Sequence, residues 1–75
     1  MPRYFFDLLD GKDWSTDDVG SEADNVEAAR CMAKMELVEI AHDELPIGQH
    51  LDLFVRIGDE AGNVAGSAQL MMHCH

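Results

Sequence analysis

Long apolar runs and paired cysteines are both missing from this chain of 75 residues. Its two cysteines, Cys31 and Cys74, stand far apart and form no CxxC pair, so the sequence shows no disulfide framework. No apolar stretch approaches the roughly 18 residues that a membrane span needs. The aromatic N-terminal segment reaches an acid at Asp7, too soon for the apolar region of a signal peptide. We therefore expect a soluble cytoplasmic protein with reduced cysteines and no membrane contact.

Basic residues are scarce. The chain has 5 lysines and arginines against 15 aspartates and glutamates, which gives a formal net charge of -10. The acids crowd the first third of the sequence, and such a surface repels phosphate backbones and anionic membranes. Nucleic-acid binding is therefore not expected. The acidic surface has two interpretations, a face that only keeps the protein soluble or a docking face for a basic protein partner.

The motifs of common enzyme classes are missing too. The sequence contains no GxGxxG or GxxxxGK[ST] phosphate-binding loop. Nucleophilic catalysis needs a base within hydrogen-bond reach of the nucleophile, and no spacing links either cysteine to any of the four histidines in that way. We therefore expect no enzymatic activity and no cofactor.

A chain of this length accommodates one domain, which we place at residues 1–75 with residues 72–75 as a tail. Such a chain buries only about 60% of its unfolded surface on folding. Proteins with so small a core usually gain stability from disulfides, a metal or a partner subunit.

Strands are predicted on both sides of one helix. Residues 4–9 are rich in aromatics and end at the turn Asp10-Gly11, and residues 14–16 have the composition of a short return strand. Residues 51–57 alternate between apolar and polar, and residues 64–71 return after a glycine-containing loop. The order predicts an α+β fold, a two-layer sandwich with one long helix packed on a three- or four-stranded antiparallel sheet.

Alternation assigns one face of each strand to the core. In the first strand Tyr4, Phe6 and Leu8 share a face, and in the third Leu51, Leu53, Val55 and Ile57 do. Trp14 is predicted to cap one end of the core. The other sheet face would carry three further apolar side chains among charges, those of Phe5, Leu9 and Phe54.

The helix signal begins at Asp24, a plausible N-cap with Glu27 at capping-box spacing. Neither glycine nor proline occurs between Val26 and Pro46, so a helix of about 18 to 20 residues ending near Leu45 is predicted. One apolar stripe, here called the inner stripe, should face the sheet and consists of Val26, Ala29, Ala33, Leu37 and Ile40.

A second stripe lies nearly opposite and is here called the outer stripe. It consists of Cys31, Met35, Val38 and His42, at spacings of i, i+4, i+7 and i+11. These residues are either scattered surface hydrophobes or a self-association face. Because the chain is too small to be very stable alone, we favour self-association as a homodimer, helix to helix or through an edge strand.

The chain ends in His73-Cys74-His75, whose thiolate and imidazole groups suit zinc, copper or nickel. Neighbouring strand residues point to opposite faces, so His73 and His75 could converge while Cys74 points away. A complete tetrahedral site would need further ligands, from His50, His42 or a neighbouring subunit.

Five sequence blocks occur in order: MPRYFFDLLDG at the start, DxxGxE from Asp17, VEAAR from Val26, DELPxG from Asp43 and DEAG from Asp59. Together they resemble a family of very short bacterial proteins that is classed as a domain of unknown function. The resemblance extends to about Leu70 and implies a stand-alone, soluble, cytoplasmic protein. It implies no activity, partner or site residues, and the His-Cys-His ending departs from the pattern.

These observations favour a small acidic protein that acts as a non-enzymatic protein-interaction module and self-associates. A protein that binds a transition metal through its C-terminal residues is the alternative.

Overall fold

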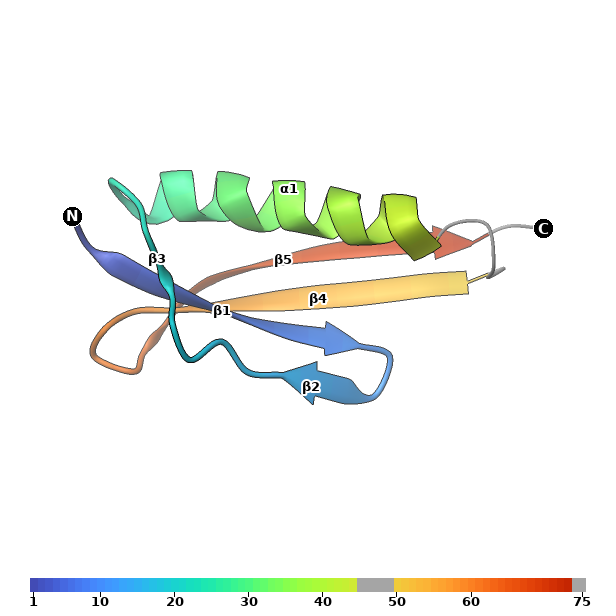
Figure 1. Cartoon of the computed structure of the whole chain (residues 1–75), viewed down its shortest axis with the longest axis horizontal. Coiled ribbons are helices and arrows are strands. Elements are labelled where there is room, and N and C mark those ends of the chain that lie inside the picture. Colours follow the sequence, from blue (N-terminus) through green and yellow to red (C-terminus); the bar gives the residue numbers. More distant parts are fainter. Residues whose placement is uncertain (45–49, 74–75) are drawn as a thin grey trace.

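A computed structural model of the chain describes residues 1–44 and 50–73. Strands and helix follow one another in the order β1 (Arg3–Asp10), β2 (Asp13–Ser15), β3 (Ser21–Glu22), α1 (Val26–Glu44), β4 (His50–Gly58) and β5 (Val64–His73). The strands form one antiparallel sheet, and α1 lies across one of its faces (Figure 1).

The expected α+β fold, with one long helix on an antiparallel sheet, is confirmed. The strand order across the sheet is β2-β1-β4-β5, and β3 pairs separately with β1. The sheet thus has five strands rather than three or four, because the two-residue strand β3 was not predicted. β5 also continues to His73, two residues past the predicted end of that strand.

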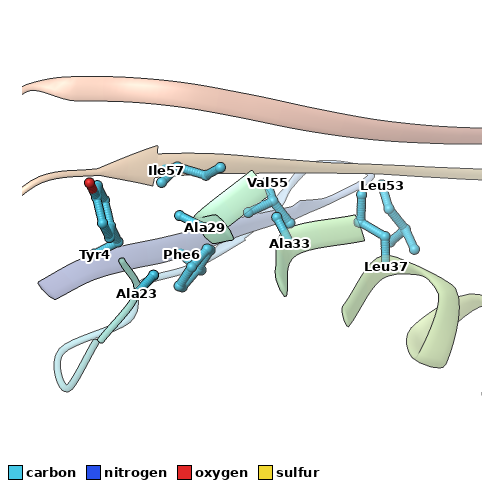
Figure 2. Close-up of a cluster of buried hydrophobic side chains, with 9 residues drawn as sticks. All are labelled: Tyr4, Phe6, Ala23, Ala29, Ala33, Leu37, Leu53, Val55 and Ile57. Atoms are coloured by element: carbon cyan, nitrogen blue, oxygen red, sulfur yellow. The ribbon is translucent and has the colours of Figure 1, made fainter. Parts of the chain in front are cut away.

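The core lies between α1 and the two long strands at the centre of the sheet. Tyr4 and Phe6 of β1 are buried, and Leu53, Val55 and Ile57 of β4 are almost completely so, as the alternation predicted. Figure 2 shows the β4 side chains pointing toward those of α1.

The inner stripe of α1 faces the sheet as predicted. Ala29, Ala33 and Leu37 are buried, Val26 and Ile40 at its two ends are half-buried, and Ala41 adds a further buried position. Alanines with no exposed surface bring the helix backbone close to the large side chains of β4. No helix within residues 1–44 and 50–73 is long and apolar enough to cross a membrane.

The N-cap of α1 is Asn25 and not Asp24. The amide nitrogen of Ala28 donates to the Asn25 side-chain oxygen at 2.9 Å, which is the bond that an N-cap residue accepts from the third helical position. Glu27 is then the second residue of the helix, and its carboxylate pairs with Arg30 at 2.7 Å. The predicted capping box is therefore wrong by one residue.

The outer edge of β1 is covered along its length. β2 pairs with Leu8–Asp10 at one end, and β3 pairs with Arg3 and Tyr4 at the other. Between them, the Asp17 carboxylate accepts a hydrogen bond from the amide of Phe6 at 3.1 Å. The connection from β2 to β3 thus closes the part of the edge that neither short strand reaches.

Asp17 also shapes the loop that carries it. Its other carboxylate oxygen accepts from the amides of Val19 at 3.1 Å and Gly20 at 2.9 Å. Gly20 has a φ of 77°, and a Cβ there would lie 2.9 Å from the carbonyl oxygen of Tyr4. Glycine is required at this position because both the backbone conformation and the close approach exclude a side chain.

Two opposing effects act on the pKa of Asp17. Burial of the carboxyl group raises its pKa, while the hydrogen bonds from the amides of Gly20, Phe6 and Val19 lower it. Together the three amides outweigh burial, so the pKa lies below its ordinary value of 3.8.

Asp17→Asn should therefore destabilise the fold, because it removes the charge and one of the two acceptor oxygens. We expect a loss of about 1–2 kcal/mol in the free energy of unfolding at neutral pH. The carboxylate's contribution is complete above pH 3.8 and is lost as the pH falls through the lower pKa of the folded state. Urea unfolding followed by circular dichroism should show the difference from wild type shrinking as the pH falls from about 4 toward about 2.

Asp18→Asn is the matched control, since Asp18 is an exposed neighbour in the same loop. It should change stability by less than about 0.5 kcal/mol. A difference between wild type and Asp17→Asn that stays constant over this pH range would contradict the assigned role.

Candidate functional site

The outer stripe lies on the side of α1 that faces away from the sheet. Met35 is 67% and Val38 62% exposed, and the side chains of Cys31 and His42 are exposed as well. Cys31 carries a free thiol. The structure thus places the four residues together on an accessible surface, and their role in binding stays a prediction.

A groove runs between α1 and β5, next to the outer stripe. Its volume is about 370 Å³. The helix contributes Arg30, Lys34, Leu37 and Val38, and β5 contributes residues 67–70. Val38 belongs to both the groove and the outer stripe, so the two form one continuous surface.

Arg30 and Lys34 are functional candidates that sequence reasoning missed. Arg30 lies over β5, where a Cβ added to Gly66 would be 3.2 Å from its Nε atom. The two cations are one helical turn apart and are two of only five in the chain. The spacing of the two cations could be read from the sequence. The identity of the strand beneath them could not, because local sequence patterns do not give the strand order.

β5 forms one edge of the sheet, and in the described ranges no segment pairs with its outer side. The strand has ten residues, and residues 61–75 include no Asp, Glu, Lys, Arg or Pro. Charges and prolines are the usual means by which proteins prevent an edge strand from pairing with another chain. The unpaired N–H and C=O groups of β5 can therefore accept a further strand.

Trp14 lies on the sheet face away from α1, so the prediction that it caps the core is wrong. In the register of β1 and β2 it stands opposite Leu9, whose side chain points to that face. The Trp14 ring meets the Phe54 ring edge-on with centroids 6.3 Å apart, and the Arg56 guanidinium lies 4.7 Å from the Trp14 ring centroid. Arg56 in turn pairs with Asp7 at 3.1 Å.

This second sheet face carries apolar side chains among charges, as expected. Phe5, Leu9 and Phe54 are half-buried there. A shallow hollow of about 250 Å³ is lined by Leu9, Gly11, Trp14, Asp52, Phe54 and Gln69. Because Trp14 is still 48% exposed, the hollow leaves part of an aromatic surface accessible.

Negative charge gathers on the flank of α1 that faces β1 and β2. Glu36 shares a depression there with Asp17, Phe6 and Leu8. Burial raises the pKa of Glu36, and the nearby charges of Asp17 and Glu39 raise it further. The acidic flank and the groove with Arg30 and Lys34 are thus on opposite sides of the helix.

The terminal ligand candidates are only partly described. The backbone of His73 is the last residue of β5 and lies opposite that of His50 in the register with β4. Cys74 and His75 lie outside the described residues. Among those that are described, no three potential metal ligands come together. The predicted metal site at His73, Cys74 and His75 therefore stays a prediction.

Comparison with known proteins gives a family but no function. A family model described as a domain of unknown function (DUF6894) matches residues 3–71. No curated protein matches the chain, and no solved structure matches it either. The matched range contains all of β1 to β4, α1 and most of β5, and it stops before the last four residues.

Proposed function

The chain belongs to the DUF6894 family, a domain of unknown function, and we propose that it is a non-enzymatic protein-interaction module that self-associates. Membership of this family supplies no substrate, so the proposal rests on the surface of the molecule. The observation that carries it is the outer stripe, an apolar surface on the exposed side of a helix whose opposite side is already buried.

A helix on an open sheet needs only one apolar face, and its other face is normally polar. In α1 the exposed face holds Met35 and Val38 with more than half of each side chain in water. Fully burying one such side chain contributes about 1.5–3 kcal/mol. For a domain of 75 residues, with the small core that this length allows, a partner on the outer stripe would add appreciably to stability.

The non-enzymatic part of the proposal rests on the residues available for chemistry. Cys31 is exposed on the outer stripe, and His42, at the end of α1, is the closest histidine in sequence. They are eleven residues apart, which is about 16 Å along a helix and far beyond hydrogen-bond reach.

Met35→Glu should weaken the dimer and leave the fold intact. Met35 is exposed in the single chain, so the substitution should change its stability by no more than about 0.5 kcal/mol. In the dimer it would bury a charge in place of an apolar group, and we expect the dissociation constant to rise at least tenfold, about 1.4 kcal/mol. Sedimentation velocity over a concentration series measures this change, with circular dichroism to confirm the helix content.

Met32→Glu is the matched control, because it adds the same charge to the same helix. Met32 lies one turn before Glu36, on the acidic flank of α1, and is 37% exposed. It should leave the dissociation constant within about threefold of wild type. A wild-type chain that is monomeric at tens of micromolar would disprove self-association.

The reactivity of Cys31 should also depend on protein concentration. In a Cys74→Ser background Cys31 is the only thiol. An exposed thiol reacts freely with a disulfide reagent such as DTNB, and burial in a dimer slows that reaction. We expect the rate constant to fall at least fivefold between low and high micromolar protein. A rate that does not change while sedimentation shows a dimer would place the interface away from Cys31.

A second candidate function is the binding of a transition metal by His73, Cys74 and His75. The register supports it, because β5 brings the backbone of His73 opposite that of His50, and histidine is a further residue type that binds such metals. Imidazole and thiolate groups favour zinc or copper over calcium or magnesium.

Isothermal titration with zinc tests this candidate on the whole chain and on a chain that ends at Met72. We expect a stoichiometric heat with the whole chain and at least a tenfold weaker association with the shortened one. The affinity should also fall as the pH is lowered toward 5.5, because protons compete for the imidazole groups. Equal, weak binding by both chains would eliminate the terminal site.

A further inference from the structure

We propose that two copies of this chain join through the outer edges of their β5 strands. The two sheets would then form one antiparallel sheet with the strand order β2-β1-β4-β5-β5-β4-β1-β2, and the two α1 helices would lie side by side on the same face. This inference rests on the self-association proposed above and specifies how the copies meet.

The two edges of the sheet differ in how far other segments of the same chain pair with them. The β1 edge is closed by β2, by the carboxylate of Asp17 and by β3. Nothing in residues 1–44 and 50–73 pairs with the outer side of β5. Since β5 is as long as any other strand here, it offers the longest row of free backbone groups in the sheet.

The distribution of charge leaves this edge as the place where a second copy can approach. Two molecules that each carry a net charge of -10 repel each other, so association is most favourable across a surface with few acids. The longest stretch without a charged side chain is residues 61–75, and it contains all of β5. The groove beside it adds the cations Arg30 and Lys34.

The position of α1 makes such pairing sterically favourable. The helix packs on β4 and β5, near this edge of the sheet (Figure 1). Neighbouring strands are about 4.8 Å apart, so helices centred between β4 and β5 in each copy would have axes roughly 10 Å apart. That separation lies at the upper end of the 8–10 Å range in which helices pack against each other.

The flank of α1 that would face the second helix carries both signs of charge. Arg30 and Lys34 line the groove, and Glu27 pairs with Arg30 at 2.7 Å. Val38, at the edge of the outer stripe, provides an apolar contact on the same side. In antiparallel copies Val38 would approach the second helix, and the rest of the outer stripe would lie above the seam.

The size of the contact fits a stable dimer. A strand of ten residues is about 33 Å long at 3.3 Å per residue. The molecule measures 42 × 21 × 17 Å, so a side strip of that length and of its thickness has a projected area of about 600 Å². Specific interfaces bury about 800 Å² on each partner, and accessible area exceeds projected area.

Ser67 and Gln69 distinguish this arrangement from a dimer held by the helices alone. They stand opposite Arg56 and Phe54 in the register with β4, so their side chains point to the face away from α1. Both are exposed. They lie close to the middle of β5, where an antiparallel pair of β5 strands would bring each near its counterparts.

The test uses two double variants of the whole chain. S67E/Q69E places like charges across the β5 seam and should raise the dissociation constant at least about tenfold. S67K/Q69K does the same with positive charge. An equal mixture of the two should form a heterodimer at concentrations where S67E/Q69E alone is monomeric, measured by sedimentation velocity. S15E/T16E is the control, since it adds the same charges at exposed positions beside the other edge.

The outcomes separate this inference from the proposed function. A monomeric wild type overturns both. A dimer that dissociates with Met35→Glu but not with S67E/Q69E keeps self-association and overturns the β5 contact. If S67E/Q69E is monomeric and its mixture with S67K/Q69K is monomeric too, the β5 contact is also overturned. Repulsion between charges across the β5 seam would then not be what dissociates the S67E/Q69E dimer.

Hydrogen exchange on the wild type provides a readout that does not depend on any variant. Alternate amides of β5 point outward, and in the dimer they should exchange at least tenfold more slowly than in the dilute monomer. Amides at the outer edge of β2 should exchange equally in both. If the β5 amides show no dependence on concentration while the protein dimerises, the edge contact is wrong.

Discussion

The close contact between the alanines of α1 and the large side chains of β4 determines the arrangement of the remaining elements. Ala29 and Ala33 are completely buried against a strand whose Leu53, Val55 and Ile57 fill the space between the layers. Because the small side chains are on the helix and the large ones on the sheet, α1 can lie close over β4 and β5. This position leaves the outer stripe in solvent, and it leaves the outer edge of β1 without cover from the helix.

The uncovered part of β1 explains the irregular segment between β1 and α1. One helix is about 10 Å wide and covers about two strands, so the outer edge of β1 needs cover from another part of the chain. Here two short strands and the Asp17 carboxylate provide that cover. The carboxylate accepts from the amide of Phe6 on that edge, in place of the backbone carbonyl that a longer strand would supply, and its bonds to Val19 and Gly20 hold its own loop in position. The same segment carries five of the fifteen acids, which are Asp13, Asp17, Asp18, Glu22 and Asp24.

The parts of the fold with a long repeating pattern could be predicted from the sequence. The inner stripe and the inward faces of β1 and β4 were predicted correctly, because the periods of 3.6 and 2 apply over many residues there. Trp14 was misplaced because β2 has three residues, all exposed, and no alternation to indicate which face points inward. The groove beside Arg30 and Lys34 depends on which strand lies under that flank, and strand order is set by long-range pairing that local patterns do not encode.

The distribution of charge relates the fold to the proposed self-association. Acids in the segment from Asp7 to Glu22 lie along the edge that the chain closes itself, while residues 61–75 carry no charged side chain. A closed edge tolerates high negative charge because its backbone groups are already paired, and repulsion there keeps other chains away. An unpaired edge strand without charged side chains can pair with the strands of other chains, which leads to aggregation. Its uncharged sequence is instead consistent with the proposed pairing of two β5 edges, because the acids on the other side of the molecule disfavour close approach of a second copy there.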